Sequence, residues 1–274
     1  MLSRIEKIEN YLWPPISLGD IAYWDGSTVK TVSQDKWDTS LGTPVGVVVI
    51  PSGMLPDGKA RIVSLSSGWT NKLWESSDEP SYPPIPFYAY YPITNNTDNT
   101  STAMTDSISY FPSDNFTGSV SYVDPNSRYY YTDNENYIPS PYLGNNKTLN
   151  ADFCKELPNG NVLSDFNGLE NTSILNSSTY PYAAAKYCWN YSDGVSNLQW
   201  YLPAMGELAF LVVRNNIINK TLQTIGSAKI ENMDIWSATC SGSSAFIVNV
   251  YDGSIDWFTI NETDYDVVPF AILN

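Results

Sequence analysis

Side chains able to do acid–base chemistry are plentiful in this chain of 274 residues, but the most versatile of them is absent. There are 29 Asp and Glu residues and no His. Without His, the usual general base and proton relay at neutral pH are missing, which excludes Ser-His-Asp and Cys-His nucleophile systems. Two carboxylates could hydrolyse a glycan, but with so many acids, pairs at a suitable spacing arise by chance. No motif singles out one pair, so we expect no enzyme, no catalytic residue and no cofactor.

The sulfur chemistry of the chain is equally sparse. Its three cysteines, Cys154, Cys188 and Cys240, are widely separated and form no Cys-x-x-Cys pair. Zinc sites in proteins need closely spaced Cys or His ligands, so the sequence predicts no metal site. We predict buried free thiols, with one disulfide as the alternative.

Aromatic and acidic residues near the C-terminal turns are the best candidates for ligand binding. Trp236, Tyr251, Asp256 and Trp257 fall around the turns between predicted strands. Aromatic faces stack on sugar rings, and carboxylates accept hydrogen bonds from sugar hydroxyls. We therefore predict that these four residues bind a glycan or protein on a host surface. The alternative places Trp236 in the core and makes Asp252-Gly253 a simple hairpin turn.

The charge of the chain limits its partners. The formal net charge is −15 at pH 7, which repels phosphate backbones and anionic membrane surfaces. No apolar run reaches the roughly 18 residues that a membrane helix requires. The first seven residues lack the apolar core of a secretory signal. We therefore expect no nucleic acid and no membrane as partner, and a protein made and folded in a cytoplasm.

The N-terminus has the pattern of a short amphipathic helix. Leu2, Ile5, Ile8 and Leu12 recur at helical spacing, and Trp13-Pro14-Pro15 ends the pattern. Two turns of helix are unstable alone, so this stripe must pack on something else. We predict that residues 1–17 are an anchoring helix and linker that binds other proteins or joins copies of the chain, a trimer being favoured. An ordinary helix docked on its own domain is the alternative.

Residues 18–65 are predicted to form strands. Asp25-Gly26 is typical of a hairpin turn within residues 19–30. Residues 43–50 form an apolar run that ends at Pro51, as expected of a buried strand. A further strand is predicted at residues 60–65.

Residues 66–170 differ from the sequence on either side. Eleven tyrosines fall between Tyr82 and Tyr142, and the stretch is rich in prolines. It is too aromatic to be disordered. We predict a long insertion of short strands and loops that presents Tyr, a residue that gives large contact area at low entropic cost. An irregular packing layer is the alternative.

Residues 171–274 are predicted to contain two helices followed by strands. The helices cover residues 178–192, with Ser178 as cap, and residues 204–225, ended by Gly226. The second begins near Pro203 and is capped by Glu207, with Trp200 and Leu202 in the core. Strands are predicted at residues 235–239, 245–251, 254–260 and 267–273. The whole indicates an α+β, β-dominated fold.

Several of these motifs together resemble a known family. They are Trp200-Tyr201-Leu202-Pro203, Gly206-Glu207-Leu208, Ile235-Trp236-Ser237-Ala238-Thr239 and Val248-Asn249-Val250-Tyr251-Asp252-Gly253. They are similar to C-type-lectin-like modules of the DUF1566 or fibrobacter-major-paralogue kind, over about residues 175–274. The resemblance implies one C-type-lectin-like domain over residues 18–274, because that fold pairs its N- and C-terminal strands. Tyr201 replaces the usual Arg, and Ser81 follows Glu79-Pro80 where calcium-type lectins have Asn, so no calcium site is implied.

A second resemblance concerns the N-terminal strands. Residues 19–30 and 43–50 resemble the opening segments of fibre proteins from phages of gut Bacteroidales. This implies a non-enzymatic virion protein, a head or tail fibre or capsid decoration, located on the virion and bound to other virion proteins. It would display a module for a host-surface glycan or protein. The alternative is a bacterial cell-surface adhesin or carbohydrate-binding protein, which would need a secretion signal.

Overall fold

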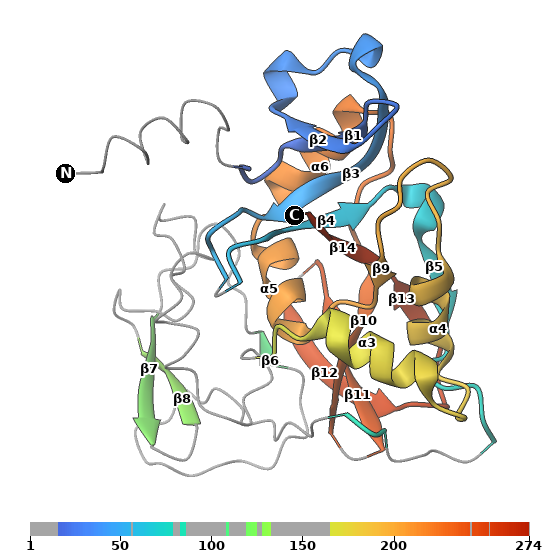
Figure 1. Ribbon diagram of the computed structural model, residues 1–274. Coiled ribbons are helices and arrows are strands. Elements are labelled where there is room, and N and C mark those ends of the chain that lie inside the picture. The colour runs from blue at the N-terminus through green and yellow to red at the C-terminus, as the bar shows by residue number, and fades with distance from the viewer. Residues whose placement is uncertain are drawn as a thin grey trace.

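The computed structural model describes residues 16–55, 57–78, 83–85, 108–109, 119–124, 128–132, 165–241, 243–251 and 253–273. Within them the chain has an α+β fold dominated by two six-stranded sheets (Figure 1). The predicted anchoring helix with Leu2, Ile5, Ile8 and Leu12 lies outside these residues, as does most of the Tyr-rich insertion. Of the insertion, an antiparallel pair of strands is described, β7 (Ser119–Asp124) and β8 (Arg128–Thr132).

The first sheet, sheet A, joins strands from both ends of the described chain. Its strand order is β2-β1-β3-β4-β14-β9. The strands are β1 (Ile21–Trp24), β2 (Val29–Val32), β3 (Thr43–Ile50), β4 (Ala60–Ser64), β9 (Trp200–Tyr201) and β14 (Phe270–Leu273). The C-terminal strand β14 pairs antiparallel with β4 on one side and with β9 on the other. The N-terminal strands and the C-terminal strand therefore share one hydrogen-bonded layer.

Local sequence explains the N-terminal part of sheet A. In the β1–β2 turn, Asp25 Oδ1 accepts the backbone N–H groups of Ser27 and Thr28, both at 2.9 Å. Gly26 has a φ of 99°, a conformation that favours glycine. The predicted hairpin is confirmed, and β3 has the predicted bounds. Two short 3₁₀ turns, η1 (Gln34–Lys36) and η2 (Thr39–Leu41), connect β2 to β3.

The second sheet, sheet B, is built mainly from C-terminal strands. Its order is β5-β13-β10-β11-β12-β6. The strands are β5 (Thr70–Lys72), β6 (Ile108–Ser109), β10 (Asp234–Ser241), β11 (Ser244–Asn249), β12 (Ser254–Thr259) and β13 (Tyr265–Val267). β10 and β13 are parallel, and the other neighbours are antiparallel. A 3₁₀ turn, η3 (Ser66–Gly68), leads from β4 into β5 and so links the two sheets.

The prediction of one strand at residues 267–273 is wrong. The chain leaves sheet B after Val267 and enters sheet A at Phe270. Pro269 lies at the crossing, and because it has no N–H group it cannot continue a ladder as donor. Its carbonyl oxygen accepts the N–H of Ser64 in β4 at 2.9 Å. The chain therefore crosses from sheet B to sheet A at this proline.

Four α-helices accompany the sheets within the described residues, and the sequence predicted them only in part. They are α3 (Gly168–Ser177), α4 (Ala183–Asn190), α5 (Met205–Val213) and α6 (Asn215–Thr224). Helix α3 was not predicted, because Gly, Asn, Thr and Ser, which are poor helix formers, make up most of it. Ser178 is not the cap of α4. It follows α3, and Tyr182 stands at the N-cap of α4.

The predicted helix at residues 204–225 is divided in two. Arg214, with φ −114° and ψ 14°, ends α5 and begins α6. The change of direction lets α6 reach the N-terminal strands, where Thr221 Oγ1 donates a hydrogen bond to the carbonyl oxygen of Gly19 at 2.9 Å. Gly226, with φ 75°, follows α6 and ends it as predicted.

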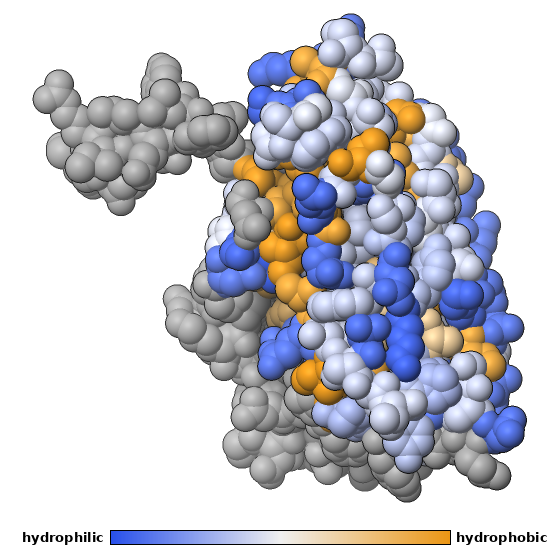
Figure 2. Space-filling model, turned by 45° about the vertical axis from the view of Figure 1, so that its right-hand side comes forward, coloured by the Kyte–Doolittle hydropathy of each residue, from blue (hydrophilic) through white to orange (hydrophobic). Residues whose placement is uncertain are grey.

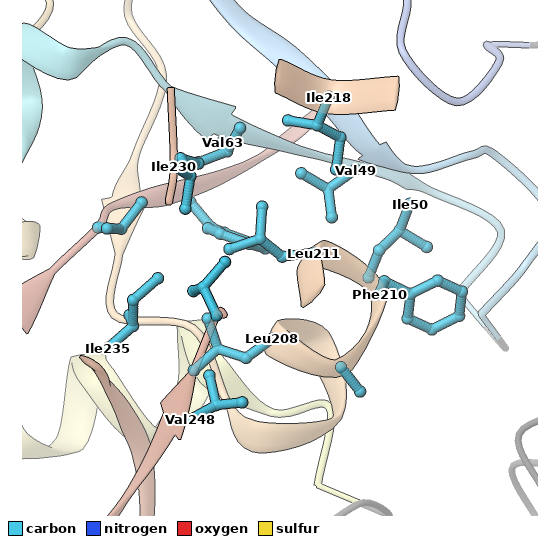
Figure 3. Close-up of a cluster of buried hydrophobic side chains, with 14 of the residues drawn as sticks. Val49, Ile50, Val63, Leu208, Phe210, Leu211, Ile218, Ile230, Ile235 and Val248 are labelled. Atoms are coloured by element: carbon cyan, nitrogen blue, oxygen red, sulfur yellow. The ribbon is translucent and has the colours of Figure 1, made fainter. Parts of the chain in front are cut away.

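The main hydrophobic core lies between the sheets around α5. Figure 3 shows Leu208 and Leu211 of α5 between Val49 and Val63 of sheet A and Val248 of sheet B. These side chains have no more than 3% of their surface exposed. Burial of apolar area of this kind is the dominant favourable term in folding.

Each sheet also has an apolar outer face. On sheet B this face carries Trp236 and Ile247, which pack with Trp74 and with α3 and α4. On sheet A it carries Val48 and Ile62, which pack with Trp200 and its neighbours. Because both faces are apolar, β3 ends in a continuous hydrophobic run, residues 47–50, rather than an alternating pattern.

The surface of the molecule is mixed in character. Figure 2 shows hydrophobic residues gathered in one band of the view, while polar residues dominate the rest of that face. Among the described residues, the large apolar side chains that are exposed stand on separate elements: Leu41, Tyr180, Val195, Ile217 and Tyr251.

Gly46 offers a test of the close approach of β3 and β4. A Cβ atom at this position would overlap the carbonyl oxygen of Val63 and lie 3.1 Å from Ile62 Cδ1. We expect Gly46→Ala to lower the free energy of unfolding by about 1–3 kcal/mol, because overpacking against backbone has no cheap relief. Urea unfolding measures it, with Thr43→Ala at the exposed start of β3 as control. A Gly46→Ala protein as stable as wild type would contradict this packing.

Candidate functional site

The four residues predicted to bind a ligand do not form one exposed surface. Trp236 has 0% of its surface exposed and belongs to the core on the outer face of sheet B. Its Nε1–H donates to the carbonyl oxygen of Lys72 at 3.0 Å, and its ring meets Tyr265 edge to face, with 4.9 Å between ring centroids. Trp236 is therefore a core residue, as the alternative interpretation of the sequence has it.

The pleat of the sheet separates the other three. Asp256 is paired with Ile247, which is paired with Trp236, so these residues share one face. Trp257 therefore points to the opposite face, where it packs against the core between the sheets. Tyr251 lies in the turn after β11 and is 82% exposed. Of the four residues, Tyr251 alone is open to a large partner.

Asp256 has an electrostatic feature of its own. Burial raises its pKa, the N–H of Trp257 opposes this shift, and the charge of Asp234 on β10 adds to it. The two carboxylates, on the strands that flank β11, thus repel one another. Among the residues that the structure covers, no group of three or more acids or cysteines is arranged to hold a metal ion.

The most organised polar cluster in the described chain lies at the first turn of α5. The residues from Pro203 to Leu208 are buried, so the free N–H groups of this helix start have no access to water. Each finds a partner inside the protein. The N–H of Met205 donates to Thr239 Oγ1 and that of Gly206 to the carbonyl oxygen of Asp165, both at 2.8 Å.

Glu207 provides the third partner. Its Oε2 accepts the N–H of Ala204 at 2.9 Å, which confirms the predicted capping role. Its Oε1 accepts the hydroxyl of Tyr201 at 2.7 Å and the Nε–H of Arg61 at 3.1 Å. One carboxylate therefore joins α5 to two strands of sheet A. We call these residues, together with Asp165 and Thr239, the α5 cluster.

Arg61 is shared between two acids. Besides Glu207, its Nη2 contacts Asp57 Oδ2 at 2.8 Å in the loop before β4. The Arg61 side chain is 5% exposed, whereas that of Asp57 is 40% exposed. Arg61 thus carries a fixed positive charge into the interior and connects it to the surface through Asp57.

Asp165 lies on the other side of the helix start. Its Oδ2 accepts the hydroxyl of Thr239 at 2.8 Å and Nδ2 of Asn171 at 3.1 Å. Its Oδ1 accepts the N–H of Asn167 at 3.0 Å. It forms three hydrogen bonds through its side chain, and none of these donors is a cation. Burial raises its pKa, and these hydrogen bonds offset the rise only in part.

The two carboxylates of the α5 cluster are buried acceptors, and their pKa values are raised. Burial raises the pKa of Glu207 to about 7, although Arg61 and the hydrogen bonds favour the charged form. Glu207 and Asp165 are 1% and 0% exposed, so a substrate does not reach either carboxylate in this conformation. Burial also raises the pKa of Cys188 and, together with the charge of Asp165, raises that of Cys240 to about 12. The buried free thiol predicted at Cys188 is confirmed.

Sequence reasoning found Glu207 but missed its partners. Arg61 stands in an apolar strand, and a lone basic residue among residues 60–65 was a signal of a buried ion pair. Asp165 had no local signal, because its three donors come from α3, from β10 and from its own turn.

No helix of the described chain combines the length and the apolarity that a membrane crossing needs.

Comparison with known proteins gives one likeness of fold. No family model matches the sequence, and no curated protein matches it significantly. A crystal structure of a fimbrial protein from Bacteroides ovatus ATCC 8483 is similar, with a TM-score of 0.52 and 15% sequence identity. The likeness covers 94% of this chain and 49% of that protein. The chain thus spans about half the length of the fimbrial protein, and at this identity the likeness concerns the fold alone.

Substitution of two of the predicted ligand residues separates structural from binding roles. We expect Trp236→Ala to cost about 3–5 kcal/mol of stability, because it empties a buried site. Tyr251→Ala should stay within about 0.5 kcal/mol of wild type, because the ring is exposed. Urea denaturation followed by far-UV circular dichroism measures both. A stable Trp236→Ala protein would show that this ring is not part of the core.

Proposed function

We propose that this protein is a non-enzymatic subunit of a surface structure, an adhesin or a component of a fimbria-like appendage. The observation that supports this most is the likeness of fold to a fimbrial protein over 94% of the chain. The α5 cluster agrees with a structural role, because its acids join helices and strands and are closed to substrate. Such a subunit contributes shape and contact surface.

The region of residues 171–274 is proposed to be a C-type-lectin-like module. The motif at residues 200–208 runs from β9 into α5, and the motif at residues 235–239 lies within β10. The pairing of β4 with β14 joins N- and C-terminal strands, as the resemblance implies. We propose that such a module presents Tyr251, at the tip of the β11–β12 hairpin, to a glycan or protein on another cell.

A virion fibre or capsid decoration protein is the second proposal. It is favoured by the resemblance of residues 19–30 and 43–50 to phage fibre openings. The net charge of −15 suits a subunit that is crowded with its copies on a particle. In this proposal residues 1–17 bind other virion proteins, and the chain forms a homo-oligomer such as a trimer.

Fractionation of the organism that encodes the chain tests these proposals. An antibody against the purified protein is used on filaments sheared from cells, on phage particles banded by density, and on cytosol. We expect the antigen in the sheared filaments and on the cell surface. Recovery with phage particles would instead support the virion proposal, and recovery in the cytosol alone would reject both.

Binding by the exposed tyrosine is tested separately with the purified full chain. We expect glycan-array or cell-surface binding to fall at least tenfold in Tyr251→Ala. Tyr180→Ala is a matched control, because Tyr180 is also exposed, at 51%, but lies between α3 and α4. Equal losses in the two variants, or no loss in Tyr251→Ala, would contradict a role of the β11–β12 tip in recognition.

A further inference from the structure

The turn that carries Tyr251 is fixed by the last residue of β11. Asn249 Oδ1 accepts the N–H of Tyr251, and the backbone carbonyl oxygen of Asn249 accepts the N–H of Gly253, both at 2.9 Å. Asn249 Nδ2 donates to Asp234 Oδ1 at 2.8 Å, across the ladder between β11 and β10. One amide side chain thus ties the turn of the exposed tyrosine to a carboxylate.

A second carboxylate lies on the same face of sheet B. Asn249 is the register partner of Asp234, and Ile247, two residues earlier in β11, is the register partner of Asp256. Because side chains alternate between the two faces along a strand, Asp234, Asn249 and Asp256 all stand on the outer face. Each of them keeps part of its surface exposed.

A second tyrosine completes this area. The ring of Tyr265 on β13 meets the buried ring of Trp236 on the outer face, and Tyr265 is itself partly exposed. Burial and the charges of Asp234 and Asp256 raise the pKa of Tyr265, so the two acids and this tyrosine lie close enough to interact. We call five residues of this area the tip patch: Asp234, Asn249, Tyr251, Asp256 and Tyr265.

The negative charge of the tip patch is not paired with a cation of the described chain. Among the described residues, no Lys or Arg forms an ion pair with either of its carboxylates. The lysine opposite Tyr265 in the sheet, Lys72 of β5, has its Nζ over the ring of Tyr187, 5.3 Å from the ring centroid. The donors to the two acids are neutral, namely the amide of Asn249 for Asp234 and a backbone N–H for Asp256.

Unpaired carboxylates beside an exposed tyrosine favour a cationic partner. A guanidinium group stacks on a tyrosine ring and forms charge-assisted hydrogen bonds with carboxylates. A neutral sugar also stacks on an aromatic ring, but it leaves the repulsion between Asp234 and Asp256 in place. Because the two acids are only partly exposed, they suit a long side chain better than a broad surface.

We propose that the tip patch binds an arginine side chain of a partner protein, with Tyr251 as the aromatic surface and Asp234 and Asp256 as the acceptors. This inference deepens the recognition role proposed for Tyr251 and rests on it. It names the chemistry of the partner, which a fold likeness leaves open. Arginine is also the charged residue that protein–protein interfaces favour.

NMR titration of the purified full chain with two short peptides tests the charge of the partner. One peptide is acetyl-Gly-Arg-Gly-amide, and the other carries citrulline, which has the shape of arginine without its charge. At low ionic strength we expect the arginine peptide to bind about tenfold more tightly, through the ion pairs and the stacked cation. Equal binding of the two peptides, or binding of neither, would overturn the proposal.

A double variant localises the binding. Asp234→Asn with Asp256→Asn removes both charges but keeps an acceptor oxygen for Asn249 and for the N–H of Trp257, so the fold should be retained. We expect it to bind the arginine peptide about tenfold more weakly than wild type and the citrulline peptide equally well. The control is Asp35→Asn with Asp38→Asn, which changes the net charge equally at exposed acids of the N-terminal region. An equal loss in the control would mean attraction to the overall charge of −15 and would reject the site.

Cell-surface binding by the same variants separates this inference from the role of Tyr251. Loss of binding in both Tyr251→Ala and the double variant supports the arginine assignment. If Tyr251→Ala loses binding and the double variant keeps it, the tyrosine has its recognition role and the arginine assignment falls. If Tyr251→Ala keeps binding, the recognition role of the tip falls, and the arginine assignment that rests on it falls with it.

Discussion

The burial of the N-terminus of α5 is the constraint on which much of this structure depends. This helix runs between two sheets, and its sequence from Met205 to Val213 contains one charged residue, Glu207. An apolar helix in this position packs into the core between the sheets, but it also takes its first N–H groups out of water. Each unsatisfied group of this kind would cost about 1–3 kcal/mol. Side chains that accept hydrogen bonds from these N–H groups, such as that of Thr239, come from other elements, which are thereby fixed against the start of α5.

The partners of α5 show how this constraint reaches across the molecule. Glu207 accepts hydrogen bonds from Arg61 in the centre of sheet A and from Tyr201 at its edge. Thr239 comes from sheet B. Its Oγ1 accepts the N–H of Met205, and its hydroxyl donates to Asp165. The two sheets are thus connected both by apolar packing and by one polar cluster. Apolar packing tolerates changes of shape, whereas the cluster fixes which strands meet the helix start.

The sequence predicted the elements whose signal is local. The Asp25-Gly26 turn, the apolar run of β3 and the end of α6 at Gly226 depend on neighbouring residues and are confirmed. The predictions failed where partners distant in the chain decide. Helix α3 forms from poor helix formers because its buried Thr172 exchanges hydrogen bonds with the backbone of Leu202. Similarly, the chain crosses from sheet B to sheet A at Pro269, where the following strand, β14, pairs with β4.

The predicted ligand site shows why spacing alone does not define a surface. Trp236, Asp256 and Trp257 are close in the sheet, but alternation places Trp257 on the opposite face from the other two. Register can be inferred from a sequence only when one face is polar, and here both faces of sheet B are apolar. The same ambiguity applied to Arg61, whose direction depends on which face of β4 meets α5.

The described residues on the two sides of the Tyr-rich stretch are held by different kinds of contact. On the entry side, Trp74 and Ile85 belong to the apolar cluster on the outer face of sheet B. On the exit side, the buried carboxylate of Asp165 accepts hydrogen bonds from Thr239 and Asn171. The chain therefore meets the domain in different ways on the two sides of this stretch: through apolar packing on sheet B before it, and after it through a polar cluster that also fixes the start of α5.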